Sequence, residues 1–284
     1  MNNSYAKYYK LKRKLMNKLA IAFAIFIAML GLALPFWILF TVVSRGMSAF
    51  NLSLFTSMTP PPDAAGGLLN AIMGSMIMVG LAMVIASPIG VMTGIYLAEY
   101  GRKQKLAAGV RFVNDILLSA PSIVIGLFIY TIMVVPMRHF SGYAGIVALA
   151  IIAVPIIVRT TENMLLLVPD MMREGAYALG SSKRQTILRI CLPAARNGII
   201  TGILLSIARI SGETAPLLFT ALNNQFFSVD LNRPMPNLPV AIFQFAMSPY
   251  DNWQGLAWAG SALIVIYVVF LNTLARVVFS RSGK

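Results

Sequence analysis

The most regular feature of this chain is an alternation between long stretches that carry no charge and short stretches that carry nearly all of it. The uncharged stretches cover residues 19–44, 64–98, 116–137, 140–158, 197–221 and 252–275, the fifth of them interrupted by one charged pair. An α-helix needs about 20 apolar residues to cross the hydrocarbon core of a bilayer, and each stretch approaches or exceeds that length. The pattern predicts an all-α polytopic membrane protein with six transmembrane helices.

The composition agrees with a chain embedded in a membrane. Of its 284 residues, 58% are hydrophobic and 11% are charged, whereas a soluble domain carries about 25% charged residues. Short connections between the spans favour one membrane bundle over two domains. The single cysteine, Cys191, excludes an intrachain disulfide and a cysteine-based metal site, so we expect it to be a packing residue.

The basic residues lie mainly at one end of the predicted spans. Residues 1–18, 99–115, 159–196 and 276–284 hold all but four of the 23 Lys and Arg residues. The exceptions are Arg45, Arg138 and Arg233, in the opposite set of connections, and Arg209, within the fifth span. By the positive-inside rule, the basic connections and both termini face the cytoplasm. The net charge of +14 therefore indicates membrane topology, and we do not expect nucleic-acid binding.

Two segments outside the spans have a distinct character. Residues 1–18 are basic with interleaved tyrosines, which suits anionic lipid headgroups. A cleaved signal peptide is the competing interpretation, but the apolar run that follows is too long for one, so we expect the first span to be retained. In the long outer loop, residues 238–247 are apolar but too short to span, and they predict an interfacial or re-entrant helix near an external partner.

Several patterns within the spans predict how the helices pack. Small residues recur at every fourth position of the second span, at Ala82, Ala86, Gly90, Gly94 and Ala98. They form one stripe along a helix, which lets a neighbouring helix approach closely. Pro121 and Gly126 predict an irregular third span. Arg159 and Glu162, three residues apart at the inner end of the fourth span, predict an interfacial ion pair.

The inner connection between the fourth and fifth spans predicts two short helices. Asp170 is placed to cap the first of them, and Gly180 suits its left-handed C-terminal stop. Ser182 and Gln185 have the spacing of a capping box that opens the second helix. Pro193 is expected to end that helix.

The fifth span carries the only charges deep within a predicted membrane helix. Arg209 lies near the middle of the span, and Glu213 follows one helical turn further toward the outside on the same face. A charge at that depth costs about 2.5–3.5 kcal/mol, so such a pair normally faces a polar cavity and marks a transport path. A buried ion pair that only fixes helix packing is the alternative, although such pairs are seldom favourable for stability alone.

The chemistry of this pair favours an oxyanion. The guanidinium group of Arg209 offers a planar set of donors that matches phosphate. The carboxylate of Glu213 would repel a dianion unless the anion donates a proton to it, as hydrogen phosphate can and sulfate cannot. We therefore expect Glu213 to hold Arg209 when the path is empty and to accept a hydrogen bond from phosphate during passage.

Two motifs carry a resemblance to a known family. The inner connection reads E-G-A-Y-A-L-G, nine residues, then I-C-L-P, and residues 207–221 read I-A-R-I-S-G-E-T-A-P-L-L-F-T-A. Together they resemble the PstA-type permeases of bacterial phosphate ABC importers, from about residue 68 to 279. The matching positions of the inner connection are Glu174, Ala176, Gly180, Ile190, Leu192 and Pro193, with Gly175 in place of the usual alanine.

The resemblance implies a fold, a set of partners and a division of roles. It implies a type I ABC importer (MetI-like) transmembrane domain in the bacterial inner membrane, with segments at 1–18, 19–67, 68–279 and 280–284. Residues 170–193 would be the loop that couples the spans to an ATPase. Arg159 and Arg209 would line the path. The partners would be a PstC-type permease, two PstB-type ATPase subunits that bind ATP and Mg, and an external PstS-type phosphate-binding protein.

Other functions leave parts of this pattern unexplained. The chain has no G-x-x-x-x-G-K-[ST] motif, so any ATP hydrolysis must come from another subunit. A passive anion channel with Arg209 as a selectivity residue is the main alternative from another class, but it does not account for the motif at 174–193. An importer of sulfate, molybdate or phosphonate is the alternative within the family. An intramembrane enzyme is less favoured, because Glu213 is the only acidic residue deep within a span.

Overall fold

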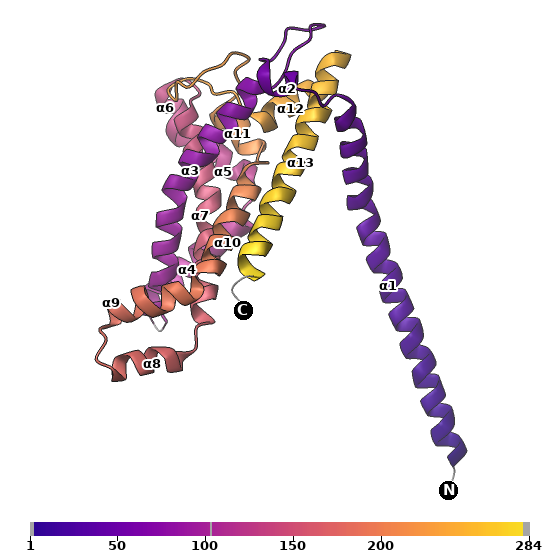
Figure 1. Ribbon diagram of the computed structural model, residues 1–284, viewed down its shortest axis with the longest axis vertical. Helices are drawn as coiled ribbons and strands as arrows, with labels where there is room; N and C mark the ends of the chain where they lie inside the picture. The colour runs from indigo at the N-terminus through magenta and orange to yellow at the C-terminus, as the bar shows by residue number, and fades with distance from the viewer. Residues whose placement is uncertain (1–2, 103, 281–284) are drawn as a thin grey trace.

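The computed structural model describes residues 3–102 and 104–280, which are almost entirely helical, without a strand among them (Figure 1). Five helices in this part of the chain are long and apolar enough to cross a membrane, and a bent helix pair brings the number of candidate spans to six. The five are Tyr8–Ser48, Leu69–Tyr100, Gly142–Leu166, Lys183–Ile210 and Asp251–Val277, and the pair is Lys105–Ser119 with Ser122–Met137. The predicted all-α membrane class is confirmed.

Most elements follow one another directly, and the longest connections are residues 57–68 and 221–237. In chain order they are α1 (Asn3–Ser48), α2 (Ser53–Thr56), α3 (Leu69–Ile95), the π-helix η1 (Tyr96–Tyr100), α4 (Lys105–Ser119), α5 (Ser122–Ile129), η2 (Tyr130–Val134), α6 (Val135–Met137), α7 (Gly142–Leu166), α8 (Asp170–Ala178), α9 (Lys183–Thr186), η3 (Ile187–Cys191), α10 (Leu192–Ile210), α11 (Ala215–Thr220), α12 (Leu238–Ala246) and α13 (Asp251–Ser280).

The first helix stands apart from the rest of the bundle. Figure 1 shows α1 leaning away from the other helices and approaching them only where it meets α13. Gly46 permits that approach, since a Cβ atom there would lie 2.7 Å from the carbonyl oxygen of Trp258. The guanidinium carbon of Arg45 lies 5.2 Å from the Trp258 ring centroid, a cation–π contact. The basic segment continues the same helix from Asn3 onward, and residues 1–2 lie outside the described residues.

The core of the bundle is built on the close pairing of α3 with α7. Gly90 and Gly94 of α3 lie directly against α7, where a Cβ atom would come within 2.7 Å of Ile157 Cβ and 2.6 Å of Thr161 Cβ respectively. Ala82, Ala86 and Ala98 are fully buried. The small-residue stripe predicted from the sequence is therefore the surface that lets these two helices pack backbone against side chain.

The third predicted span is broken near its start. Residues 105–119, expected as an inner loop and the start of a span, form helix α4, and the chain then bends by 104° before α5. The bend lies at Ala120 and Pro121, whose backbones are extended. A residue before proline is disfavoured in the helical region, which explains why the uncharged run 116–137 does not form one helix. As predicted, the span itself is irregular, with a π-helical turn at Tyr130–Val134.

The fourth and fifth spans also differ from the predicted boundaries. Helix α7 continues beyond 158 to Leu166. The predicted span 197–221 is broken, because α10 ends at Ile210 and α11 begins only at Ala215. The prediction that Pro193 ends a helix is wrong, since the helical stretch Lys183–Ile210 continues through it. The π-helical turn Ile187–Cys191 precedes the proline, and its wider hydrogen bonding accommodates a residue that lacks an N–H group.

The outer end of the bundle is covered by the loop that follows α11. The helix predicted at 238–247 is present as α12, where the Asn237 side chain accepts a hydrogen bond from the Val240 N–H at 3.1 Å. Ser75 of α3 accepts a further hydrogen bond, from the Leu238 N–H at 2.8 Å. Helix α12 therefore packs into the bundle through buried Leu238, Val240 and Phe245. Of the predicted tail 280–284, all but Ser280 lies outside the described residues.

The close pairing of α3 and α7 leads to a first prediction. Gly94→Val places a branched side chain against Thr161 and is expected to destabilise the protein by about 1–3 kcal/mol, the usual range for overpacking. The thermal unfolding midpoint of the purified protein in detergent measures this. Gly80→Ala is the matched control, because the space beside Gly80 is open. Equal midpoints for Gly94→Val and Gly80→Ala would contradict the assigned packing.

Candidate functional site

The charged pair of the fifth span lies at the break between α10 and α11. The Arg209 Nη2 atom is 3.7 Å from the Glu213 Oε1 atom, and the two side chains are 54% and 13% exposed. The predicted contact between Arg209 and Glu213 is confirmed. The prediction that both residues stand on one continuous helix is wrong, since α10 ends at Ile210 and Glu213 belongs to the connecting turn.

Arg209 borders a small cavity on one side of α10. The cavity has a volume of about 80 Å³ and lies between α7, α10 and the bend that joins α4 to α5. It is lined by Leu117, Leu118, Ala120, Ser122, Ile125, Ile152, Ile156 and Arg209. Arg209 is the one charged side chain in this lining. An anion in the cavity would therefore be attracted to its guanidinium group. Within this chain, the Arg209 side chain is half-exposed.

Arg159 lies on the face of α7 that lines this cavity, further along the helix. Ile152, Ile156 and Arg159 are spaced by four and three residues, which places them on one helical face. Arg159 therefore follows the cavity lining by one turn toward the inner loop. The predicted pair between Arg159 and Glu162 is wrong: the Arg159 Nη1 atom lies 3.8 Å from Asp115 Oδ1, while Glu162 binds Arg111 at 2.6 Å. The spacing within α7 could not predict these pairs, because the partners of Arg159 and Glu162 both lie on α4.

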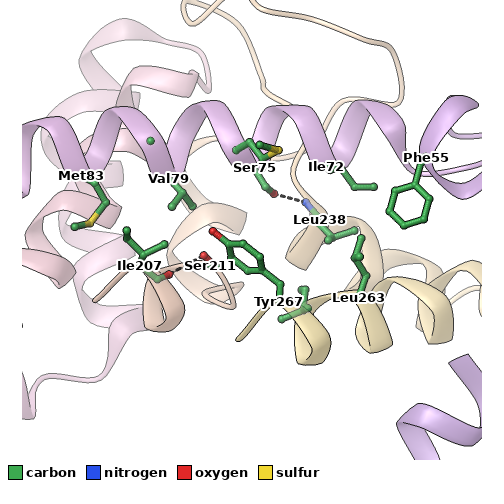
Figure 2. Close-up of a pocket in the computed structure, with 13 residues that line it drawn as sticks. Phe55, Ile72, Ser75, Val79, Met83, Ile207, Ser211, Leu238, Leu263 and Tyr267 are labelled. Carbon is green, nitrogen blue, oxygen red and sulfur yellow. Dashed lines mark hydrogen bonds between the residues drawn. The ribbon is translucent and has the colours of Figure 1, made fainter. Parts of the chain in front are cut away.

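The opposite side of α10 is apolar. Figure 2 shows a cavity between α3, α10 and α13, whose volume is about 310 Å³. Its polar side chains are few, namely Ser75, Ser211 and Tyr267, and two of them are engaged in hydrogen bonds with backbone atoms. No charged residue lines this cavity. In this part of α10, the charged side chain Arg209 lies at the cavity beside α4 and α7, and the cavity on the other side has no charged lining residue.

The inner loop has the two helices that the sequence predicts. Helices α8 and α9 lie together at the inner end of the bundle, on the same side as the N-terminal end of α1 (Figure 1). Gly180 adopts the left-handed conformation, with φ of +81°, and Ser182 and Gln185 form the predicted capping box. Asp170 is not the predicted cap, since its side chain makes no capping hydrogen bond and instead binds Arg102 and Arg173.

The predicted coupling residues divide into an outward and an inward group. Glu174 and Gly175 are exposed on α8, whereas Ala176 is buried. Ile190 and Leu192 are half-buried, and Pro193 is exposed. Large apolar side chains also point away from the bundle: Met171 is 82% exposed and Leu179 is 88% exposed. Exposed apolar side chains of this size on a charged loop are typical of an interaction surface.

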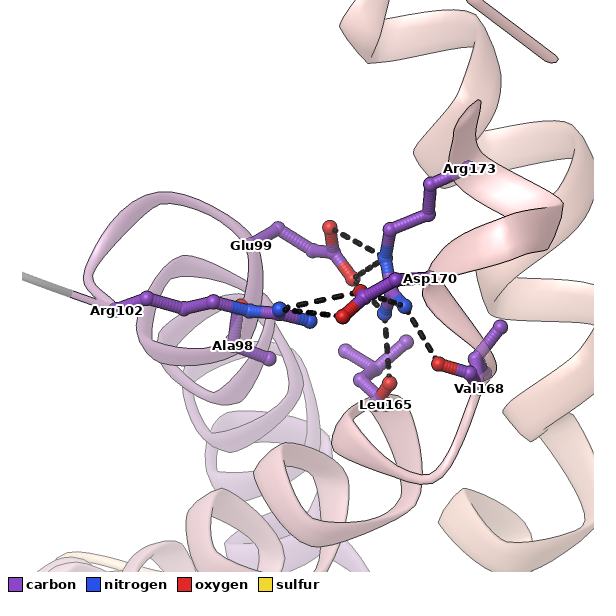
Figure 3. Close-up of polar contacts among 7 residues, drawn as sticks. All are labelled: Ala98, Glu99, Arg102, Leu165, Val168, Asp170 and Arg173. Carbon is purple, nitrogen blue, oxygen red and sulfur yellow. Dashed lines mark hydrogen bonds and ion pairs between the residues drawn. The ribbon is translucent and has the colours of Figure 1, made fainter. Parts of the chain in front are cut away.

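Arg173 ties this loop to the bundle, and the sequence analysis did not identify it. Figure 3 shows its buried guanidinium group between Glu99 of η1 and the carbonyl groups at the end of α7. Its Nη2 atom is 2.7 Å from Glu99 Oε1 and 2.8 Å from the Leu165 oxygen, and its Nη1 atom is 2.6 Å from the Val168 oxygen. The hydrogen bond with Glu99 raises the pKa of Arg173 above its ordinary value.

The contacts of Arg173 join α8 to the nearby end of α7 and to Glu99, which lies 74 residues earlier in the chain. Arg102 adds a second, more exposed contact, in which its Nη1 atom lies 3.2 Å from Asp170 Oδ1. These contacts connect α8 to the end of η1, which continues α3, and to the end of α7. The sequence signal was available in Glu99, the first charge after the uncharged run 64–98, but its partner lies 74 residues away. No group of His, Cys, Asp and Glu residues that could hold a metal occurs in the described part of the chain.

Comparison with known proteins gives a consistent result. Residues 90–283 match the family described as "Binding-protein-dependent transport system inner membrane component". The "Phosphate transport system permease protein PstA" of Yersinia pestis is 59% identical over 270 residues, which cover 95% of this chain and 92% of the relative. The protein of the same name from Haemophilus influenzae is 55% identical over 94% of this chain and 95% of its own length. "PstA 1" of Mycobacterium tuberculosis is 35% identical over 94% and 89%.

Solved structures share the fold at lower identity. A chain of the inward-facing MetNI methionine ABC transporter superposes with a TM-score of 0.64 at 21% identity, covering 75% of this chain and 95% of that chain. A chain of a bacterial ABC transporter involved in the import of the acidic polysaccharide alginate gives a TM-score of 0.57 at 12% identity, covering 95% and 98%. The likeness confirms the predicted MetI-like transmembrane fold.

The position of Arg173 leads to a second prediction. Arg173→Gln leaves the carboxylate of Glu99 buried without its charged partner and is expected to cost about 3–5 kcal/mol, as for other buried pairs broken on one side. The thermal unfolding midpoint in detergent again serves as the measurement. Arg102→Gln is the control, because its pair with Asp170 is exposed and is expected to contribute less than about 1 kcal/mol. Similar losses for the two variants would contradict the anchoring role of Arg173.

Proposed function

Since this chain belongs to the family of binding-protein-dependent transport system inner membrane components and is a PstA-type permease, we propose that it forms half of the membrane path of an ATP-driven importer of inorganic phosphate. The observation that carries the proposal is the position of Arg209, half-exposed beside a cavity and held only loosely by Glu213. A charge in a membrane span normally faces a path or a water-filled cavity. The chain itself is a transport subunit.

The chemistry of the pair favours phosphate among the oxyanions. A separation of 3.7 Å between Arg209 and Glu213 exceeds the 2.7–2.9 Å or so of a strong charge-assisted hydrogen bond, so an entering anion can take the place of the carboxylate. Glu213 then remains close to the bound anion and repels it unless a proton lies between them. Hydrogen phosphate brings that proton, whereas sulfate is fully deprotonated at neutral pH. Arg159 continues the path toward the inner end.

Energy for transport comes from separate subunits that dock on the inner loop. The coupling region comprises Glu174, Gly175 and Ala176 of α8 and Gly180 after it. Ile190 of η3, with Leu192 and Pro193 at the start of α10, joins that region to the fifth span. The exposed Met171 and Leu179 supply apolar area for the contact. Through Arg173, the motion of a docked ATPase reaches α3 and α7. ATP and Mg are bound by that partner.

The complete transporter contains three further kinds of subunit. We assign to it a PstC-type permease for the other half of the path, two PstB-type ATPase subunits, and a PstS-type phosphate-binding protein at the outer end. The concentration of Lys and Arg in the inner connections orients the chain with both termini in the cytoplasm. The exposed face that carries Arg209 and Arg159 is then completed by the second permease.

Purification from native membranes, followed by reconstitution, tests this function. The expected result is a complex with a P-loop ATPase and a second permease, which moves radiolabelled phosphate into vesicles only when ATP and the binding protein are supplied. ATP-independent flux through this chain alone would instead identify a passive anion channel. ATP-driven uptake of sulfate, molybdate or phosphonate without phosphate would assign the chain to another oxyanion.

The role assigned to Glu213 gives a third prediction. Glu213→Gln replaces the charged acceptor of the phosphate proton by a neutral amide and is expected to lower phosphate uptake by roughly tenfold or more, since a hydrogen bond to a charged group contributes about 1.5–3 kcal/mol. Uptake by whole cells, scaled to the amount of assembled complex, is the readout. Asp251→Asn, at the exposed start of α13, is the control. Unchanged phosphate uptake in Glu213→Gln counts against the role.

The conformation of Gly180 gives a fourth prediction. Its φ of +81° costs an L-residue about 1–2 kcal/mol and a β-branched residue more, so Gly180→Val distorts the stop of α8. We expect this variant to hydrolyse ATP with little phosphate transport, measured together in reconstituted vesicles. The control is Gly109→Val, at a helical glycine with open space around it and no left-handed backbone. A normal ratio of transport to hydrolysis in Gly180→Val would be evidence against the coupling role.

A further inference from the structure

Four charged side chains meet where α4 packs against α7. Helix α4 contributes Arg111 and Asp115, and α7 contributes Arg159 and Glu162. They pair across the two helices: Arg111 Nε lies 2.6 Å from Glu162 Oε1, and Arg159 Nη1 lies 3.8 Å from Asp115 Oδ1. The two pairs share the same helices but differ in burial and in length.

The shorter pair fixes the two helices against each other. The Glu162 side chain is 5% exposed, and Arg111 also donates a hydrogen bond to the Leu97 oxygen at 2.9 Å. Next to Asp115, the Asn114 side chain donates to the Pro155 oxygen at 3.4 Å. These buried contacts are costly to break. They hold α4 in a position that places the carboxylate of Asp115 beside Arg159.

The longer pair has the opposite character. The side chains of Arg159 and Asp115 are 48% and 56% exposed. At 3.8 Å, the two groups attract each other without a short hydrogen bond, and exposed pairs of this kind contribute little to stability. An anion that arrives at Arg159 can therefore displace the carboxylate without breaking the packing of α4 on α7.

The exposed pair adjoins the cavity of Arg209. Leu118 lies in the cavity lining one helical turn after Asp115, and Ile156 lies in it one turn before Arg159. Because α7 runs from the outer end of the bundle to the inner loop, Arg159 stands on the inner side of that cavity. An anion that leaves Arg209 toward the cytoplasm meets the Arg159–Asp115 pair next.

We propose that Asp115 is a positioning residue of the transport path, the resident counterion of Arg159. Asp115 holds the guanidinium group when the path is empty and gives way when an anion passes from Arg209. This inference rests on the proposed function, since it takes the anion past Arg209. It repeats the arrangement of Arg209 with Glu213, so that two arginine–carboxylate pairs stand in series along the path.

The series arrangement follows from what conduction requires. Binding sites along a path must attract the ion but also release it. A bare guanidinium group would retain a phosphate group, whereas a carboxylate beside it competes for the same donors and promotes release. A second carboxylate also repeats the preference for an anion that carries a proton. Asp115 therefore increases the rate of passage.

A double-mutant cycle on the assembled transporter tests this proposal. Asp115→Asn, Arg159→Gln and the double variant are compared for uptake of radiolabelled inorganic phosphate into vesicles that contain the whole complex, with ATP and the binding protein. Asp115→Asn is expected to lower uptake by about two- to fivefold, the range set by an exposed ion pair. The double variant is expected to transport as Arg159→Gln does, because Asp115 acts only through that residue.

Conservative and matched variants separate this role from a structural one. Asp115→Glu keeps the charge and is expected to retain most of the uptake. Asp230→Asn removes a carboxylate from the exposed Arg233–Asp230 pair of the outer loop and is expected to leave uptake unchanged. All rates are divided by the amount of complex, measured from the ATPase subunit that co-purifies.

Two results would overturn the proposal. One is wild-type uptake in Asp115→Asn, and the other is a double variant whose loss is the product of the two single losses. Failure of the proposed function is a separate outcome. If the wild-type complex transports sulfate and not phosphate, the substrate assignment fails, and the same cycle measured with labelled sulfate decides the counterion role by the same two criteria.

Discussion

The requirement that every charge and every backbone polar group in a membrane must find a partner governs this structure. It is met at the break between α10 and α11, where the Ser211 N–H still binds the Ile207 oxygen and the Glu213 N–H binds the Ile210 oxygen. The turn therefore leaves few unsatisfied groups although the helix has ended. Arg209 stands in the last turn of α10, where the negative end of the helix dipole favours a cation. Helix geometry, and not packing alone, holds a guanidinium group beside open space.

Four ion pairs of the described residues form two kinds, to which we assign different purposes. Arg173 with Glu99 and Arg111 with Glu162 are short, at 2.7 Å and 2.6 Å, with both carboxylates buried, and they fix the inner loop and α4 to the bundle. Arg209 with Glu213 and Arg159 with Asp115 are longer, at 3.7 Å and 3.8 Å, and more exposed. In the proposed mechanism, the short pairs transmit movement from the inner loop because they stay intact. The second kind can exchange its carboxylate for a passing anion.

The features that could be predicted from the sequence are those determined by residues close together in the chain. The α3 stripe at Gly90 and Gly94, the left-handed Gly180 and the capping box at Ser182 each depend on residues within one helix or one turn. The features that could not be predicted depend on partners distant in the chain or on a break in a helix. The absence of charge along 116–137 does not reveal the bend at Pro121, and the partners of Glu162 and Glu99 lie 51 and 74 residues away in the chain. The family resemblance identified the function that these local features leave open.

In the proposed transport cycle, Arg209 borders a route that opens to each side of the membrane in turn. Ser122 lines the same cavity, and a cysteine there can report its accessibility once the single buried Cys191 is replaced by serine. The measurement is the labelling rate of Ser122→Cys by a membrane-impermeant thiol reagent, applied from either side of vesicles that contain the whole transporter. We predict rapid labelling from one side at rest, and a shift of labelling to the other side when ATP and loaded binding protein are added. Slow labelling from both sides in both states would contradict the claim and would place Arg209 in a closed seam.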